Sequence, residues 1–321
     1  MTIPVRLAYL AVFVGVLGHA SSEFFAVLSG VAGPEVSVWR YLFGGAGLVI
    51  LALLISGGRN LIRPLRTHRP QLVLYSLIGV SGAYLAFHWA LDFASVIQVA
   101  TLVTTIPIFV GLINLAVNGQ PITGVKMATG ACAVVGLVLL ITDGALERLS
   151  GESYSILGVF LGLCSASGVA YYAIKVKPII GQYGALEITA VTMMIGGLGL
   201  WLGVGLALAV WVDPTNLFER PTIAWGSLLT LALWNATITQ FFWIGGLAAA
   251  PDMTRASYIF FLKPVIAAVL ALTILGQHIS LLQVCAIGVV TGSVLVELFW
   301  PTVSRLWKPS PSPAGENRSP P

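Results

Sequence analysis

Lys263 stands in the middle of the apolar stretch RASYIFFLKPVIAAVLALTILG, which runs from Arg255 to Gly276 and is long enough to cross a bilayer. An ammonium group near mid-bilayer costs about 2.5–3.5 kcal/mol on insertion scales, so it needs a compensating group. Pro264 cannot donate a hydrogen bond to the carbonyl of Phe260, and the freed oxygen is one such acceptor. Lys263 is therefore a candidate for binding a substrate carboxylate in a central cavity. The alternative is a structural pair with a neighbouring acceptor.

Polar side chains in two other apolar stretches are candidates for the same cavity. Ser81, Tyr84 and His88 follow i, i+3, i+7 spacing, which places them on one helix face. Trp234 and Asn235 lie near the middle of the stretch LWNATITQFFW, where an amide requires a partner or water. We expect these five residues to contact substrate, and His88 is also a candidate proton carrier. For each residue, ordinary packing in the core is the alternative.

Three further residues complete the expected binding set. Tyr258 offers an aromatic wall, although it lies only about one turn inside its helix, and Gln98 and Thr101 add polar groups before Pro107. Pro107 and Pro264 each remove a backbone donor from an apolar helix. We expect these two prolines to act as hinges.

Three ionisable residues occur together in the first two apolar stretches. His19 and Glu23 are four residues apart, and Arg40 lies at a similar depth in the next stretch. An ion pair between Glu23 and Arg40 would cancel two charges that are costly in a membrane. We interpret the three residues as a structural ion pair or an extracellular gate, with proton sensing by Glu23 as a further possibility.

The elements that must position these residues are membrane-spanning helices. The chain has 321 residues, of which 57% are hydrophobic and 9% charged, whereas roughly 25% are charged in ordinary soluble domains. Its unbroken apolar runs approach the ~20 residues that a helix needs to cross a bilayer. The sequence therefore predicts an all-α polytopic membrane protein with ten transmembrane helices at 5–28, 34–56, 71–90, 95–117, 123–141, 156–176, 186–211, 222–246, 253–275 and 280–299.

The distribution of charge predicts topology rather than nucleic-acid binding. Most lysines and arginines fall in segments that share one side of the membrane if the N-terminus is inside, whereas Arg148 and Arg220 fall on the other side. We expect both termini to be cytoplasmic in a bacterial inner membrane. The first run is too long for a signal-peptide core. The three cysteines lie in apolar runs without CxxC or His/Cys ligand spacing, so we expect no disulfide, metal or cofactor.

An internal repeat is visible when the chain is shifted by 157 residues. Pro107 then falls on Pro264, Gly119–Gln120 on Gly276–Gln277, and Ile122 on Ile279. Two five-helix halves, 1–142 and 155–300, follow from this match, and the odd helix number inverts the second half. Inverted repeats predict a central cavity near mid-bilayer and alternating access. The Pro- and Ser-rich tail, 301–321, should be a disordered cytoplasmic segment.

Two stretches resemble the drug/metabolite transporter superfamily, and within it the EamA-type ten-helix proteins. They are ALDFASVIQVATLVTTIPIFVGLINLAVNGQPITGVKMATGACAVVGLVLL and PDMTRASYIFFLKPVIAAVLALTILGQHISLLQVCAIGVVTGSVLVE, each with a proline, a short polar turn and a glycine-bearing final helix. The resemblance covers about 1–300. The aromatic helices and Lys263 are similar to those of the bacterial aromatic amino acid exporters called YddG, which implies export. Gln120 and Gln277 replace the acidic residue that the family usually carries, which weakens proton coupling at the turns.

Other functional classes match the residues less well. There is no HExxH motif, P-loop or Ser/His/Asp constellation of an enzyme, and neither the filter loops nor the charged rings of a channel. Carriers of phosphate esters need several deep cations, and with Lys263 as the deep cation a zwitterion fits better. The sequence therefore predicts a monomeric secondary transporter that exports neutral amino acids. A multidrug exporter, for which Glu23 would supply the carboxylate, or another small-metabolite exporter is the alternative.

Overall fold

The computed structural model describes residues 4–31, 33–55, 61–94, 99, 102–143, 145, 156–275 and 280–306. Side chains at 23, 27, 141, 270–275, 301 and 303–306 lie outside that description. The regular elements in the described ranges are all helices. Those up to residue 142 are α1 (Val5–Leu28), α2 (Gly33–Leu54), α3 (Ile62–Ser76), the π-helix η2 (Leu77–Gly82), α4 (Ala83–Ala90), α6 (Ile106–Asn118) and α7 (Gly124–Thr142).

The helices beyond residue 155 follow the same order of long and interrupted segments. They are α8 (Ile156–Tyr183), α9 (Ala185–Leu208), the 3-10 helix η4 (Pro214–Glu219), α10 (Thr222–Ala232), the π-helix η5 (Leu233–Ile238), α11 (Thr239–Ala249), α12 (Met253–Ser257), the 3-10 helix η6 (Tyr258–Leu262), α13 (Lys263–Leu275) and α14 (Leu281–Leu306).

Short polar segments end and begin the helices at specific residues. Gly119 ends α6 with φ 66°, a left-handed conformation that glycine adopts without steric cost. The Thr123 side chain accepts a hydrogen bond from the backbone N–H of Lys126 and so caps α7. Asp252 caps α12 in the same way through the N–H of Arg255, at 2.9 Å. The polar turn GQPIT therefore fixes where one helix stops and the next starts.

Four apolar segments are interrupted rather than continuous. The π-helices η2 and η5 lie in the middle of the third and eighth expected spans. The ninth is interrupted by the 3-10 helix η6 just before Lys263 and Pro264, and the fourth has a turn at Thr104–Thr105 just before Ile106 and Pro107. A proline removes a donor at each of the latter two sites, which favours a break there.

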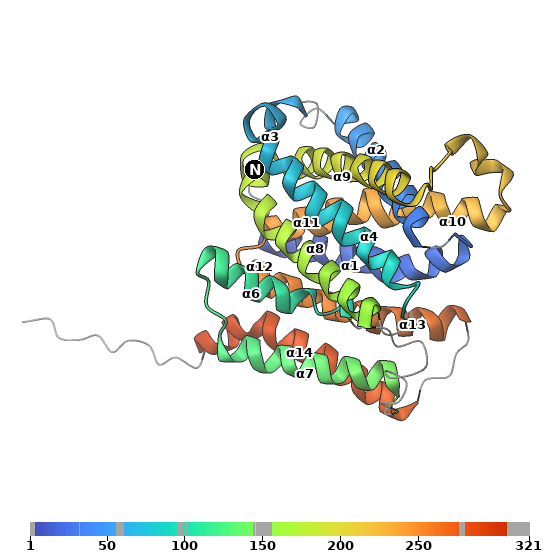
Figure 1. Ribbon diagram of the computed structural model, residues 1–321. Coiled ribbons are helices and arrows are strands. Elements are labelled where there is room, and N and C mark those ends of the chain that lie inside the picture. Colours follow the sequence, from blue (N-terminus) through green and yellow to red (C-terminus); the bar gives the residue numbers. More distant parts are fainter. Residues whose placement is uncertain are drawn as a thin grey trace, which may run out of the picture.

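The helices lie side by side and pair across the molecule (Figure 1). The most extensive contacts join α2 to α9, α1 to α11 and α7 to α14, and α4 packs on α8. In Figure 1 the α7–α14 pair forms one side of the molecule, α2 and α9 lie toward the opposite side, and α1, α4, α8 and α11 lie between them. Every one of these pairs joins a helix before residue 143 to a helix after residue 155.

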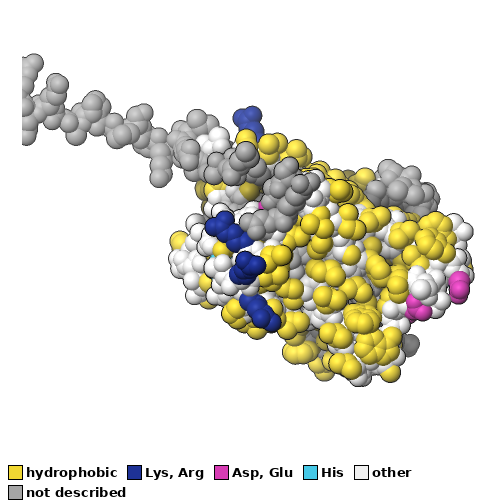
Figure 2. Space-filling view, turned by 90° about the horizontal axis from the view of Figure 1, so that it is seen from above, with side chains coloured by type: hydrophobic (Ala, Val, Ile, Leu, Met, Phe, Trp, Pro, Cys, Tyr) yellow, Lys and Arg dark blue, Asp and Glu magenta, His cyan; other side chains and the backbone are white. Residues whose placement is uncertain are grey.

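The outer surface is that of a protein embedded in lipid. Figure 2 shows a broad hydrophobic face, with Lys and Arg side chains in a row toward one end and acidic side chains at the other. Large apolar side chains such as Ile156 and Leu206 are exposed on this surface. Seven helical spans in the described ranges are long and apolar enough to cross a membrane, and 106–118 and 124–140 are shorter apolar helices. The prediction of an all-α polytopic membrane protein is confirmed.

Helix boundaries differ from the expected ones in three places. The third span begins nine residues earlier, at Ile62, because α3 continues through a kink at His68, before Pro70. The sixth extends to Tyr183, seven residues past the expected end, and carries Lys177 beyond the apolar run. The last helix continues to Leu306, so 301–306 are helical rather than disordered. The remainder of the expected tail, 307–321, lies outside the described residues.

Candidate functional site

A narrow cavity with a volume of about 20 Å³ lies between the two halves of the chain. Its walls come from α1, α2, α4, α6, α8, α11, η6 and α13. Basic, polar and aromatic side chains share the lining with a few aliphatic ones. The lining residues are His19, Ser22, Arg40, Tyr84, Phe87, Val103, Ile106, Ser165, Val169, Trp243, Phe260 and Lys263.

Lys263 lies on the cavity wall, where the sequence predicted it. It is the first residue of α13, directly after the 3-10 helix η6, and it is 4% exposed. Its Nζ is 5.6 Å from the ring centre of Phe87 and 5.9 Å from that of Phe260. Cation–π attraction to two rings offsets part of the cost of burying the ammonium group. The side chain therefore offers a positive charge beside apolar walls.

Arg40 is a second cation on the same cavity. It is 1% exposed, and its Nη2 donates to the backbone carbonyl of Asn235 at 3.0 Å. The guanidinium carbon lies 5.1 Å from the ring centre of Tyr41. Its Nε has no hydrogen-bond partner among the described groups. Because the Glu23 side chain lies outside the described residues, the ion pair between Glu23 and Arg40 stays a prediction.

Tyr84 and His19 also line the cavity. Tyr84 stacks on Tyr41, with ring centres 4.1 Å apart, and its hydroxyl accepts a hydrogen bond from Nε2 of Gln240 at 2.7 Å. The His19 imidazole meets Trp243 and Phe260 edge to face, with centres 5.7 and 5.5 Å away. These contacts fix the orientation of both rings.

His88 lies behind this wall rather than on it. Its Nδ1 is 2.6 Å from the hydroxyl of Ser37 in α2 and 3.1 Å from the backbone carbonyl of Tyr84. The residue is 1% exposed and is absent from the cavity lining. This placement supports a role in joining α2 to α4, and direct contact with substrate stays a prediction.

Four other predicted binding residues make contacts between helices. Ser81 donates to the Gly196 carbonyl in α9 at 2.7 Å, because the π-helix η2 alters the helical register before Tyr84. Trp234 donates from Nε1 to the Ser21 hydroxyl at 3.1 Å. None of these four residues lines the cavity. The four are Ser81, Trp234, Asn235 and Tyr258.

Asn235 and Tyr258 each hydrogen-bond to a neighbouring helix. Nδ2 of Asn235 donates to the Gly18 carbonyl at 2.6 Å and to the Ser21 hydroxyl at 2.9 Å, so this amide holds α1 against η5. The Tyr258 hydroxyl donates to the Lys126 carbonyl at the start of α7. The remaining two predicted binding residues, Gln98 and Thr101, lie outside the described residues.

The two predicted hinges flank the cavity. Pro107 follows Ile106 at the start of α6, and Pro264 follows Lys263 at the start of α13. Ile106 and Lys263 both line the cavity. A change of angle at either proline would therefore move a wall of the cavity, although the hinge role itself stays a prediction.

Sequence reasoning missed three aromatic walls, Phe87, Trp243 and Phe260. All three are buried and line the cavity. An aromatic residue in an apolar helix does not differ in polarity from its neighbours, so hydropathy does not single it out. The available signal was closeness in sequence to a predicted site residue: Phe87 precedes His88, and Phe260 lies three residues before Lys263. In the described part of the chain, no group of three His, Cys, Asp or Glu side chains is arranged to hold a metal.

Comparison with known proteins agrees with this arrangement. The profile of the EamA-like transporter family matches residues 6–142 and again residues 156–299. The uncharacterized transporter YyaM of Bacillus subtilis is 23% identical over 82% of this chain and 85% of its own length. A probable terminal-alkyne amino-acid exporter of Streptantibioticus cattleyicolor is 24% identical over 76% of this chain and 80% of its own. One solved crystal structure superposes with a TM-score of 0.77 at 17% identity, covering 95% of this chain and all of that protein, which supports the fold alone.

Proposed function

This chain belongs to the EamA-like transporter family, and from that premise we propose that it exports amino acids, both aromatic and other neutral ones, by alternating access. It is a multi-pass membrane protein that carries small molecules, and its relatives are transporters rather than enzymes. The proposal concerns which molecules it carries and how.

The cavity supports a carboxylate-bearing substrate. Lys263 and Arg40 both reach it, and in a low-dielectric site a cation interacts strongly with a carboxylate through a charge-assisted hydrogen bond. The rings of Phe87, Trp243 and Phe260 supply the apolar walls that an aromatic or aliphatic side chain needs. Cations beside aromatic walls are the observation that carries this proposal.

Arg40 is a second cation of the cavity besides Lys263. The expected ion pair of Arg40 with Glu23 stays a prediction beside this placement. Two positive charges disfavour cationic drugs as substrates. They favour another small metabolite with a carboxylate as the second candidate.

The name of one relative supports amino acids over other acids. The Streptantibioticus cattleyicolor protein is named a probable amino-acid exporter, and it aligns with three quarters of this chain. At 24% identity this likeness is an argument for the class of substrate and not for a particular amino acid.

Alternating access is supported by the internal repeat. We propose that 1–142 and 155–300 are five-helix repeats of inverted orientation. The family profile matches the chain twice, and the π-helices η2 and η5 fall at equivalent positions of the two matches. Exchanging the halves turns the α1–α11 pair into the α8–α4 pair, and leaves the α2–α9 and α7–α14 pairs unchanged.

The proposed orientation places both termini in the cytoplasm of a bacterial cell and the helices in the inner membrane. The row of basic side chains toward one end of the molecule in Figure 2 supports it. The binding face lies inside a single chain, so we propose that a monomer is sufficient for transport.

Counterflow in proteoliposomes tests the proposed substrate. Vesicles loaded with unlabelled tryptophan or threonine should accumulate the labelled amino acid, because exchange needs no external energy source. Lys263→Ala should abolish exchange or reduce it by about tenfold or more, as expected when a charge-assisted contact is lost. The matched control is Lys175→Ala, since the Lys175 ammonium lies over the Tyr171 ring outside the cavity.

Each outcome has a distinct meaning. Exchange that is lost in folded Lys263→Ala and kept in Lys175→Ala supports carboxylate binding at mid-bilayer. Exchange that survives in Lys263→Ala would make Lys263 structural. If no amino acid exchanges, other carboxylates become the next substrates to test, and Glu23→Gln would examine the alternative of cationic drugs.

A further inference from the structure

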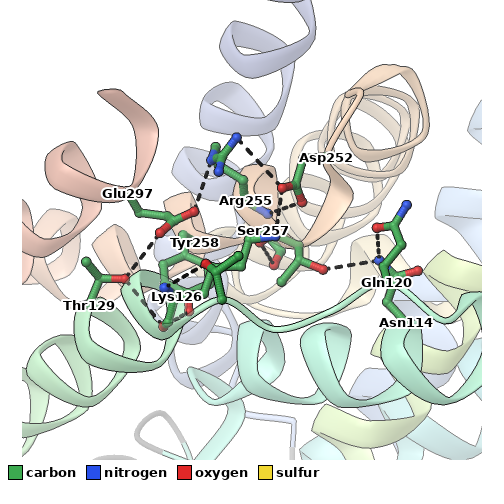
Figure 3. Close-up of polar contacts among 11 residues, drawn as sticks. Asn114, Gln120, Lys126, Thr129, Asp252, Arg255, Ser257, Tyr258 and Glu297 are labelled. Carbon is green, nitrogen blue, oxygen red and sulfur yellow. Dashed lines mark hydrogen bonds and ion pairs between the residues drawn. The ribbon is translucent and has the colours of Figure 1, made fainter. Parts of the chain in front are cut away.

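A network of charged side chains joins the two halves at the end of the molecule where α7 and α12 begin (Figure 3). Lys126 Nζ lies 2.7 Å from Oδ2 of Asp252. Arg255 Nε lies 3.0 Å from Oε1 of Glu297, and Arg255 Nη1 lies 3.8 Å from Oδ2 of Asp252. The pair of Lys126 and Asp252 joins α7 of the first half to the cap of α12 in the second, whereas both pairs of Arg255 lie within the second half and link α12 to α14.

Uncharged groups extend the same contact. The Tyr258 hydroxyl donates to the Lys126 carbonyl, and the Thr129 hydroxyl donates to Oε2 of Glu297 at 3.4 Å. Nδ2 of Asn114 in α6 donates to the Thr254 hydroxyl at 3.2 Å. Each of these bonds joins a residue before 143 to a residue after 155, so together they hold the two halves against each other.

One partner in two of these ion pairs is buried. The Glu297 side chain is 1% exposed and that of Lys126 is 8% exposed, whereas those of Arg255 and Asp252 are 20% and 25% exposed. A shielded ion pair is screened less by solvent and salt, and removing one partner leaves the other charge buried. The half-exposed pair of Arg220 and Glu35, 2.8 Å apart at the other end of the molecule, lacks this shielding.

A short helix connects the network to the cavity. Tyr258 is the first residue of the 3-10 helix η6, and its ring packs between α7 and α14. Phe260, two residues later, lines the cavity, and Lys263 follows directly after η6. A displacement of η6 by a ligand at Phe260 or Lys263 would therefore also move Tyr258 away from the Lys126 carbonyl.

We propose that Lys126, Asp252, Arg255 and Glu297 form the cytoplasmic gate of the transport cycle. The cytoplasmic path is closed while their ion pairs are formed, and it opens when the halves separate there. The 157-residue shift of the proposed repeat pairs these four positions with Gln283, Ser95, Gln98 and Leu140, which carry no charge. The charged cluster is therefore not repeated at the equivalent positions, and the pair of Arg220 and Glu35 at the opposite end uses other residues. This inference rests on the alternating access proposed above, and not on the substrate.

Thiol labelling of the cavity tests the gate without any substrate. The reporter is Ser165→Cys, a buried position on the cavity wall, in a chain whose three natural cysteines are replaced by serine. A membrane-impermeant maleimide is applied separately to the cytoplasmic face and to the outer face of vesicles. The gate variants are Arg255→Gln and Asp252→Asn, and the matched control is Arg220→Gln.

We expect both gate variants to label at least about fivefold faster from the cytoplasmic face, the lower end of typical coupling between two states. Arg220→Gln should leave that rate unchanged. Unchanged cytoplasmic labelling in both folded gate variants, or an equal increase in Arg220→Gln, would overturn the proposal. A rise from the outer face alone would overturn the assignment to the cytoplasmic side.

A variant of the other partner separates loss of the ion pair from loss of the helix cap, because Asp252 also caps α12 through the N–H of Arg255. Lys126→Gln removes the ion pair and leaves the cap in place, so it should also label at least about fivefold faster from the cytoplasmic face. A folded Lys126→Gln variant that labels at the wild-type rate would overturn the proposal. Counterflow of amino acids, measured in parallel, can fail without changing any labelling result, so the gate and the substrate are tested separately.

Discussion

At the scale of single residues, Asn235 connects three helices. Its side-chain amide donates to the Gly18 carbonyl and the Ser21 hydroxyl of α1, and its backbone carbonyl accepts from Arg40 of α2. Three helices therefore depend on a single residue in the π-helix η5. Extra backbone acceptors in π-helices allow such contacts without breaking the helix entirely.

Asn235→Ala should lower the free energy of unfolding. Two buried hydrogen bonds disappear, and each is worth about 0.6–1 kcal/mol within a membrane, so the total is ~1–2 kcal/mol. Thermal unfolding in detergent, followed by tryptophan fluorescence, measures the change. Asn216→Ala, at an exposed position of the 3-10 helix η4, is the control. An equal loss of stability in both variants would contradict a specific role for the Asn235 amide.

A site residue could be predicted from the sequence only where its polarity differed from that of its neighbours in the helix. Lys263 and Tyr84 were recognised because polar groups are rare in apolar helices, and both line the cavity. Tyr258 and Trp234 were expected there too, but counting residues along a helix gives depth and not direction. Phe260 was missed because a ring among apolar neighbours is unremarkable in the sequence.

At the scale of helices, close contact between α2 and α9 requires glycine at one position. A methyl group at Gly197 would lie 2.5 Å from the Tyr41 carbonyl oxygen and 2.7 Å from the Leu42 Cα. Both atoms belong to the backbone, so neither can move independently. At Gly203, six residues further along α9, no atom lies within 4 Å of such a methyl group.

Gly197→Ala should therefore destabilise the protein by about 1–3 kcal/mol, the usual cost of overpacking. Gly203→Ala should be neutral or more stable by up to about 1 kcal/mol, because alanine favours a helix. Unfolding of the two variants in the same detergent gives the comparison. If Gly203→Ala proved as destabilising as Gly197→Ala, the tight contact between α2 and α9 would not be the cause.

The positions of the helices followed from the apolar runs, whereas their interruptions did not. Hydropathy marks which residues are in the membrane, and the two prolines mark where a donor is lost. A π-turn adds one residue to a helical turn without changing composition, so η2 and η5 left no trace in the sequence. That extra residue is why Ser81 and Tyr84 face different partners.

At the scale of the whole molecule, the ion pair of Lys126 and Asp252 joins the two halves at one end, and it should respond to pH through Asp252. Burial raises the pKa of its carboxyl, but the hydrogen bond from Lys126, the N–H of Arg255 and the charges of both residues outweigh this effect and lower the pKa. Glu297, Lys177, Tyr9 and Tyr258 are further ionisable groups near this cluster. A carboxyl with a lowered pKa in the folded state stabilises that state when ionised.

The stabilisation from Asp252 should be fully present above the unfolded-state pKa of about 3.9. It should disappear as the pH falls through the lower pKa of the folded state, because protonation removes the pair with Lys126. The wild-type melting temperature in detergent should therefore fall more steeply below about pH 4 than that of Asp252→Asn. Glu219→Gln, whose exposed side chain has no ion pair with any described residue, should keep the wild-type slope. Parallel curves for wild type and Asp252→Asn would show that the contact between the halves does not depend on this carboxylate.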